Sequence, residues 1–220
     1  MSPDLLLRAL AALIPMLLSL TVHEYAHAWT AARLGDDTAE RLGRLTLNPI
    51  PHIDPVGTLL LPALSVIFPG MPFFGWARPV PVDPTRFRRD VSMGAGMALT
   101  ALAGPASNVL LAFLSAALFG LGYRFGVLVD QPAIRALLGS MMTLNLVLAI
   151  FNLVPIPPLD GSRFVDWLLP YRYRDAWHAV QQFSPFLLIG LFYLAPLFLS
   201  GPMGLASELL ERFLSFVAGA

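Results

Sequence analysis

Long apolar runs separated by short polar segments make up most of the chain. Four of these runs could cross the roughly 30 Å hydrocarbon core of a bilayer as helices: residues 5–32, 92–123, 135–153 and 180–199. The pattern therefore predicts an all-α polytopic membrane protein with about four spanning helices. The first run lacks a charged n-region and a small-residue cleavage site, so we expect it to be retained as a membrane anchor.

Two neighbouring segments do not follow the pattern of a spanning helix. Residues 57–74 have the length of a short span, but Pro62, Pro69 and Pro72 interrupt them. We predict that this segment is re-entrant: it enters the bilayer and returns to the same side. The sequence GWARPVPVDP that follows alternates β-branched residues with prolines, which is typical of an extended edge strand or a loop.

The last apolar segment, residues 205–216, places Leu and Phe at helical spacing with charged residues between them. This pattern predicts a C-terminal amphipathic helix at the membrane interface. No repeat, low-complexity tract or flexible linker divides the sequence. We therefore expect residues 1–220 to form one membrane-embedded domain.

Composition supports the membrane assignment. Hydrophobic residues make up 56% of the 220 residues and charged residues 13%, whereas a soluble domain carries about 25% charged residues. The formal net charge is +0, and the basic residues, all arginines, are spread between the apolar runs. We therefore expect no nucleic-acid partner. The absence of cysteine excludes disulfides and thiolate metal sites.

The first apolar run contains a pattern found in metal-dependent hydrolases. His23, Glu24 and His27 form the sequence HExxH. On a helix, positions i and i+4 share one face, so both imidazoles can bind one metal while Glu24 reaches a water molecule beside it. A charged residue inside a membrane helix costs about 2.5 to 3.5 kcal/mol, so this cluster indicates function rather than packing. The chemistry fits zinc, which needs a third protein ligand in a catalytic site.

Asp160 is the candidate for the third ligand. It follows the third apolar run in the sequence NLVPIPPLDG, where closely spaced prolines break the helix and present extended backbone to a cavity. Spacing alone leaves an alternative open, because Asp160-Gly161 is also a common turn-forming pair. His52, in the sequence NPIPHIDP, could approach the metal, but we expect a loop histidine to be solvated.

Three motifs, taken in order, resemble those of the site-2 protease family of intramembrane zinc metalloproteases: HEYAHAW, AGPASN and NLVPIPPLDG. The stretches RLGRLTLNPIPHIDPVGTLLLP and FGWARPVPV resemble the compact bacterial branch of that family, which has no inserted PDZ or CBS domain. The resemblance extends from about residue 21 to residue 163. It implies a multi-pass protein of the bacterial inner membrane.

The resemblance also implies a role for each residue that it matches. His23, His27 and Asp160 become the ligands of one Zn²⁺ ion, and Glu24 becomes the catalytic acid/base. Asn152 becomes a polar group that faces the reacting carbonyl, where an amide donor to the developing oxyanion is worth about 3 to 4 kcal/mol.

Two further asparagines lie in the apolar runs. In the family the residue matched by Asn108 lies near the active site, which implies a role beside a metal ligand or on the substrate backbone. The alternative is an amide that only packs helices together. Asn145 lies two helical turns before Asn152, and we interpret it as a packing residue.

The proposed ligands constrain the topology. His23 and Asp160 must lie on one side of the membrane, which requires an even number of crossings between them and agrees with the return of residues 57–74. Ten arginines then share the side of the metal: Arg33, Arg41, Arg44, Arg78, Arg86, Arg88, Arg89, Arg163, Arg172 and Arg174. Four lie opposite: Arg8, Arg124, Arg135 and Arg212. The positive-inside rule makes the arginine-rich side cytoplasmic.

The sequence thus predicts a zinc-dependent endopeptidase that cuts transmembrane proteins or peptides near the cytoplasmic side of the bilayer. A second interpretation is a membrane-anchored zinc peptidase that acts on soluble polypeptides. A third is a metal-binding transporter or scaffold without proteolytic activity. Glu24 argues against the third, because a transporter needs metal ligands but no general base beside them. The sequence specifies no oligomeric state.

Overall fold

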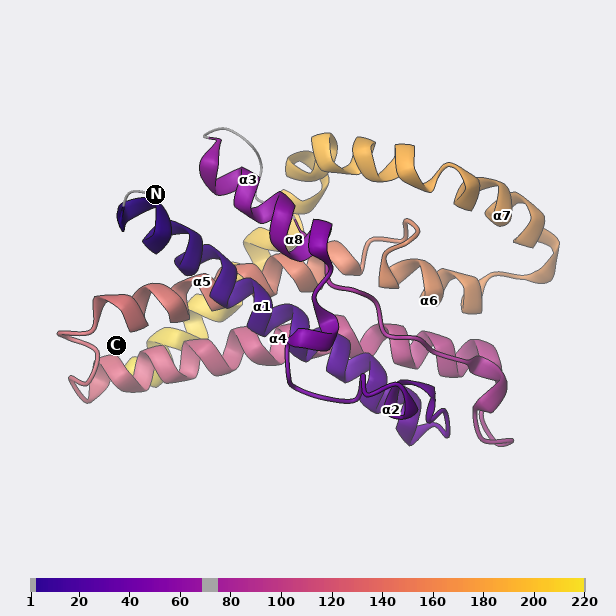
Figure 1. Ribbon diagram of the computed structural model, residues 1–220, viewed down its shortest axis with the longest axis horizontal. Coiled ribbons are helices and arrows are strands. Elements are labelled where there is room, and N and C mark those ends of the chain that lie inside the picture. Colours follow the sequence, from indigo (N-terminus) through magenta and orange to yellow (C-terminus); the bar gives the residue numbers. More distant parts are fainter. Residues whose placement is uncertain (1–2, 69–74, 220) are drawn as a thin grey trace.

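The computed structural model describes residues 3–68 and 75–219, without the side chains of residues 3–8, 192, 195 and 196. This part of the chain is helical and contains no strand (Figure 1), so the predicted all-α fold is confirmed. The long helices are α1 (Pro3–Arg33), α4 (Met93–Arg124), α5 (Pro132–Asn152) and α8 (Ser184–Ala218). The shorter elements are α2 (Thr38–Arg41), η1 (Ile50–His52), η2 (Pro55–Leu60), α3 (Leu61–Ile67), η3 (Pro84–Arg86), α6 (Asp160–Leu168), η4 (Tyr171–Tyr173) and α7 (Arg174–Gln182).

Three of the four predicted spans are confirmed as helices long and apolar enough to cross a membrane. Within the described residues they are Ala9–Arg33, Met93–Arg124 and Pro132–Asn152. The fourth predicted span, residues 180–199, covers the end of α7 and the first half of α8, where some side chains lie outside those described. That span stays a prediction.

Helix α4 is central to the bundle and packs against α1, α5, α6 and α8. Its buried positions are mostly small residues, among them Gly96, Ala98, Ala101, Gly104, Ala112, Ala116 and Gly120. Small residues let two helix backbones approach closely, and this close packing is what holds helices together inside a membrane. As a result, the HExxH sequence of α1 lies directly against the AGPASN sequence of α4.

The segment predicted to be re-entrant starts and ends at one place. Its first part, Pro55–Ile67, is an apolar helix too short to cross a bilayer. Trp76 N donates a hydrogen bond to Gly57 O at 3.2 Å, and Thr58 Oγ1 donates to Trp76 O at 2.7 Å. Because these hydrogen bonds join the two ends, the chain comes back to the side from which it left. Residues 69–74, between them, lie outside the described part.

Residues 75–83 continue from the re-entrant segment as an extended loop. They form no strand. The proline pattern predicts either an edge strand or a loop, and the structure shows the loop.

The predicted helix over residues 205–216 is confirmed, and its position at the membrane interface stays a prediction. These residues form the second half of α8, which passes behind α5 and α4 in Figure 1. Leu210 is buried against Ala112 and Ala116 of α4 and Leu146 of α5. An apolar helix face can cover either lipid or another helix, and here the small residues of α4 provide the complementary surface.

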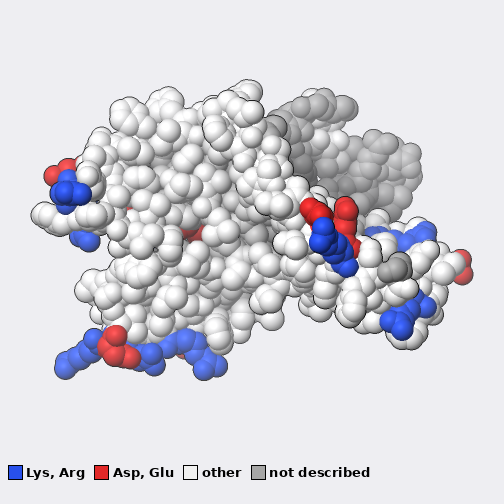
Figure 2. Space-filling view, turned by 180° about the vertical axis from the view of Figure 1, so that it is seen from behind, with Lys and Arg blue, Asp and Glu red and all other residues white. Residues whose placement is uncertain are grey.

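In the view of Figure 2 most charged side chains lie toward the two ends of the long axis, one further charged group lies right of centre, and a broad, almost uncharged surface covers much of the rest. Before α4 begins, Arg86 pairs with Asp37 at 2.7 Å, whereas Arg124 closes α4 at its far end. An apolar band between two charged ends is the distribution expected for a protein embedded across a bilayer.

Candidate metal centre

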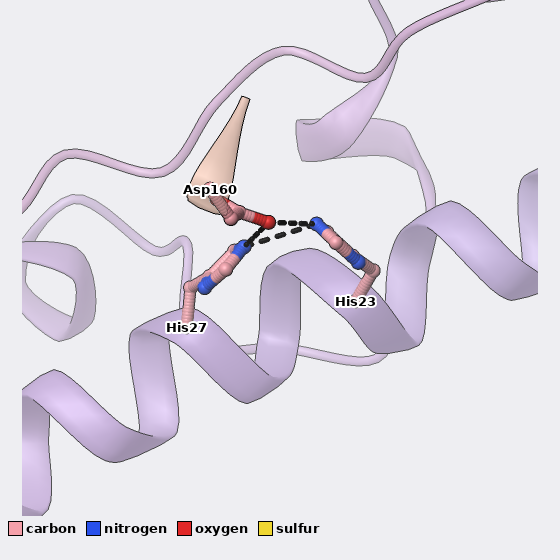
Figure 3. Close-up of side chains that lie close together, drawn as sticks. All are labelled: His23, His27 and Asp160. Atoms are coloured by element: carbon pink, nitrogen blue, oxygen red, sulfur yellow. Dashed lines mark hydrogen bonds and ion pairs between the residues drawn. The ribbon is translucent and has the colours of Figure 1, made fainter. Parts of the chain in front are cut away.

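Helices α1 and α6 bring three possible ligand atoms to one point (Figure 3). His23 and His27 project from the same face of α1, and Asp160 is the first residue of α6. Asp160 Oδ2 lies 3.2 Å from His23 Nε2 and 3.4 Å from His27 Nε2, and the two Nε2 atoms are 3.0 Å apart. Both histidines are buried, and the Asp160 side chain is 19% exposed.

Hydrogen bonds to α4 determine which nitrogen of each histidine carries the proton. His23 Nδ1 lies 2.6 Å from Asn108 Oδ1, and His27 Nδ1 lies 2.7 Å from Thr100 O. Carbonyl oxygens only accept hydrogen bonds, so each Nδ1 must donate. Each neutral imidazole therefore presents an unprotonated Nε2 to the centre, which is the form that binds a metal.

Each of the three atoms at the centre can donate an electron pair to a metal. Asp160 Oδ2 is buried and has no hydrogen-bond partner among the described residues. Such a group is unstable unless a cation occupies it, because a buried charge must be paired or coordinate a metal. Tetrahedral zinc, with bonds of about 2.0 to 2.1 Å, would place its ligand atoms about 3.3 Å apart. The observed separations match this value, so the donor set fits zinc.

When no metal is bound, a proton on the Nε2 of His23 or His27 can take the place of the cation. Burial raises the pKa of the Asp160 carboxyl, but the hydrogen bond and positive charge supplied by such a proton outweigh burial and hold the pKa below its ordinary value. The carboxyl therefore stays deprotonated, which is the form that binds a metal.

Local packing explains the glycine that follows Asp160. A Cβ atom on Gly161 would lie 2.3 Å from Leu153 O, so only glycine lets the first turn of α6 approach the end of α5 this closely. Asp160 and Gly161 both belong to α6. The alternative interpretation of this pair as an ordinary turn is therefore wrong.

One face of α4 is shaped to receive the two imidazoles. Thr100, Gly104 and Asn108 follow one another at a spacing of four and face His27 and His23. A Cβ atom on Gly104 would lie 2.5 Å from His27 Nε2 and 2.6 Å from His23 Cε1. Any larger residue at this position would displace both rings.

A buried polar chain extends from the centre into the membrane helices. Asn108 Nδ2 donates to Asn145 Oδ1 at 2.7 Å, and Asn145 Nδ2 donates to Ser19 Oγ at 2.9 Å and to Met141 O at 2.8 Å. Asn108, Asn145 and Ser19 are all fully buried. Because each amide can satisfy its neighbours in only one orientation, Asn145 fixes the amide of Asn108, and Asn108 fixes the ring of His23. Asn145 thus contacts the support of a candidate ligand as well as packing helices.

Other predicted site residues lie as follows. Glu24 is buried beside the histidines in sequence, and its Oε2 accepts a hydrogen bond from Val80 N at 2.8 Å. Asn152 Nδ2 donates to Leu148 O in its own helix at 2.9 Å, so its amide points along α5.

His52 is 2% exposed, and its Nε2 lies 2.9 Å from Thr46 O, so the expectation that it is solvated is wrong. It is not a member of the His-His-Asp group.

Sequence reasoning missed several contacts of the centre. Gly104 was detectable, because Thr100, Gly104 and Asn108 repeat the spacing of His23 and His27. The contacts of Thr100 O and of the Val80 N–H could not be predicted from the sequence. Every residue has a main-chain carbonyl oxygen and every residue except proline has a main-chain N–H, so neither atom depends on the residue type.

Comparison with known proteins agrees with this geometry. The family described as "Peptidase family M50" matches residues 123–191, which include Asp160. The chain is 38% identical over 187 residues to "Putative zinc metalloprotease YwhC" of Bacillus subtilis, which covers 84% of this chain and 80% of that protein. It is 34% identical over 186 residues to "Putative zinc metalloprotease Rip2" of Mycolicibacterium smegmatis, covering 82% of this chain and 65% of that protein. No solved structure matches the chain.

Fold and site together define a membrane-embedded helical protein with a buried His-His-Asp group suited to a metal ion. The chain belongs to peptidase family M50, the site-2 protease family of zinc-dependent intramembrane proteases. Membership in a hydrolase family does not favour the interpretation as a transporter or scaffold.

Proposed function

We propose that this chain hydrolyses peptide bonds of transmembrane proteins or peptides near the cytoplasmic side of the bilayer. In this proposal His23, His27 and Asp160 hold one zinc ion, and Glu24 is the catalytic acid/base. The convergence of three possible ligand atoms on one point, among helices long and apolar enough to cross a membrane, is the observation that supports it most strongly.

The chemistry divides between the metal and Glu24. Bound zinc supplies a Lewis acid that polarises the substrate carbonyl and lowers the pKa of a bound water to about 7. The Glu24 carboxylate has one oxygen, Oε2, occupied by the Val80 N–H. Its other oxygen, Oε1, would take the proton from the attacking water and deliver it to the leaving nitrogen.

Asn152 is proposed to donate to the developing oxyanion. Its amide now bonds to Leu148 O, so this role requires a rotation of the side chain toward the substrate when substrate binds.

We further propose that residues 1–220 act as one membrane domain of multi-pass type in the bacterial inner membrane. The arginine-rich end, which contains Arg86 and Arg88, would face the cytoplasm under the positive-inside rule. The metal centre would then lie nearer the cytoplasmic face, because it is formed by the second half of α1 and the start of α6.

Cleavage in a bilayer tests the proposal. The purified protein is placed in lipid vesicles with a pool of synthetic single-span peptides, each with about 20 apolar residues, and products are identified by mass spectrometry. We expect cleavage of the membrane peptides, its loss on treatment with 1,10-phenanthroline, and its recovery when zinc is restored. Unfolded casein serves as the soluble substrate and should stay intact.

The other outcomes of this experiment identify the alternatives. Cleavage of casein but not of the membrane peptides would indicate a membrane-anchored peptidase for soluble polypeptides. One bound zinc per chain without cleavage of either substrate would indicate a metal-binding scaffold, and would contradict the proposal.

Replacing Asn145 with leucine should weaken zinc binding by about 10-fold, the lower end of the range for residues that orient metal ligands. Leucine has a similar volume but cannot accept from Asn108 Nδ2, so the Asn108 amide and then the His23 ring lose their fixed orientation. Competition with a chelator measures the affinity. Ser115→Ala is the matched control, because Ser115 is also a buried polar residue but bonds only within α4. Equal affinity in Asn145→Leu and wild type would mean that Asn145 only packs helices.

A further inference from the structure

The extended segment formed by residues 75–83 is attached to the rest of the protein by hydrogen bonds from its main-chain N–H groups, and one of these hydrogen bonds reaches the candidate site. Trp76 N donates to Gly57 O, and Arg78 N donates to His52 O at 2.8 Å. Val80 N donates to Glu24 Oε2, and Asp83 N donates to Asp36 Oδ2 at 2.7 Å. The segment is therefore bound to the protein at four points, and one of these points is the proposed catalytic carboxylate.

Prolines stiffen the segment where it meets Glu24. Pro79 and Pro81 flank Val80, and each proline fixes its own φ and biases the residue before it toward extended backbone. Arg78 and Val80 are thus both held extended by the residue that follows. Neither proline carries an N–H, so the Val80 N–H is the one main-chain donor from residue 79 to residue 81.

A buried arginine anchors the same segment one residue away from the first proline. Arg44 is 7% exposed, and its Nη2 donates to Arg78 O at 2.5 Å. Arg44 also lies close enough to Glu24 for their opposite charges to attract. The two main-chain groups on either side of Pro79 are therefore held by a buried cation and a buried anion respectively.

We propose that the Arg78-Pro79-Val80-Pro81 segment is a rigid positioning support for Glu24. The Val80 N–H would hold Oε2 and thereby aim Oε1 at the reacting water, while Arg44 and the prolines keep the N–H at a fixed place. A hydrogen bond to an ionised group is among the stronger ones in proteins, and it restrains a side chain that otherwise has three rotatable bonds. This inference rests on the proposed function, because it assigns Glu24 the role of acid/base.

The same contacts also fit the opposite role, a segment that blocks the site, and the experiment must distinguish the two roles. An extended chain bonded to the catalytic carboxylate could instead occupy the place of a substrate and block it. A support should lower turnover when its N–H is removed, whereas a blocking segment should raise it.

Val80→Pro removes the N–H that bonds to Glu24 and keeps the backbone extended, and its ring Cδ takes the place of the amide hydrogen, so Glu24 Oε2 must move away. We expect kcat for a peptide cleaved by the wild type to fall about 10- to 100-fold, with KM changed less than about threefold and zinc content unchanged. The separate variant Val80→Ala keeps the N–H and should retain most of the wild-type kcat. Val82→Pro is the matched control, since no hydrogen bond of the Val82 N–H occurs in the described structure, and it should leave kcat unchanged.

A second variant protects the test against misfolding of the first. The double variant Pro79→Ala, Pro81→Ala retains every donor but removes the stiffness, and we expect kcat to fall several-fold at unchanged zinc content. An unchanged or increased kcat in Val80→Pro would overturn the proposal, and so would loss of zinc from Val80→Pro, because the segment would then hold the metal site itself. Failure of the wild type to cleave any membrane peptide would instead overturn the proposed function.

Discussion

Asp160→Ala should leave the protein without bound zinc and without proteolytic activity. Asp160 supplies the only negative charge among the three ligand atoms, and its Oδ2 lies 3.2 and 3.4 Å from the two Nε2 atoms. Two neutral imidazoles alone bind zinc far more weakly, so we expect an affinity loss greater than the roughly 100-fold that altered supporting residues can cause. Elemental analysis of the purified protein should find about one zinc per wild-type chain and almost none in the variant.

Asp166→Ala is the control for this experiment. Asp166 lies on the same helix, α6, but accepts hydrogen bonds from Trp177 and Gln181 rather than facing the histidines. Its replacement should leave the zinc content at the wild-type value. Full retention of zinc by Asp160→Ala would show that another residue completes the site. His52 would be tested first, although it is buried beside Thr46 O and outside the group.

Glu24→Gln should abolish cleavage while the zinc stays bound. Glutamine has the same shape, and its carbonyl oxygen can still accept from the Val80 N–H, so the site should keep its structure. It cannot take a proton from water or return one to the leaving nitrogen, so we expect kcat to fall by about 10³-fold or more. Single-turnover cleavage of a membrane peptide in vesicles measures the loss, and zinc content is measured on the same sample.

The control is Glu40→Gln, an exposed carboxylate on α2. It should cleave as the wild type does. Activity within about tenfold of the wild type in Glu24→Gln would exclude Glu24 as the acid/base. Loss of zinc from this variant would mean that Glu24 serves the metal site as a structural residue instead.

The arrangement of charges in the centre explains why these two variants should differ. Asp160 contacts both imidazoles, so its loss should remove one of the three proposed ligands. Glu24 contacts a main-chain N–H instead, so its loss should remove the proposed proton carrier and leave the proposed ligand atoms in place. The pair of experiments therefore separates binding of the metal from use of the metal.

The apolar pattern was sufficient to predict most of the helices. Residues 92–123 and 135–153 were predicted within a few residues of α4 and α5, because helix length in a bilayer is set by its thickness. The return of residues 57–74 was also predictable, since His23 and Asp160 can meet only if that segment does not cross. The packing of residues 205–216 against α4 was not predictable, because an apolar helix face has the same spacing whether lipid or α4 covers it.

Part of the candidate site was likewise predictable from the sequence, and part was not. The sequence by itself identified His23, Glu24 and His27 as candidate site residues, because a helix places residues four apart on one face. Only the tertiary structure brought Asp160 to the two Nε2 atoms, connected His23 through Asn108 to Asn145, and placed the Val80 N–H on Glu24. Those contacts join residues far apart in the chain. Gly104 lets α4 approach the two imidazoles, and Gly161 lets α6 approach the end of α5, to distances that no local pattern encodes.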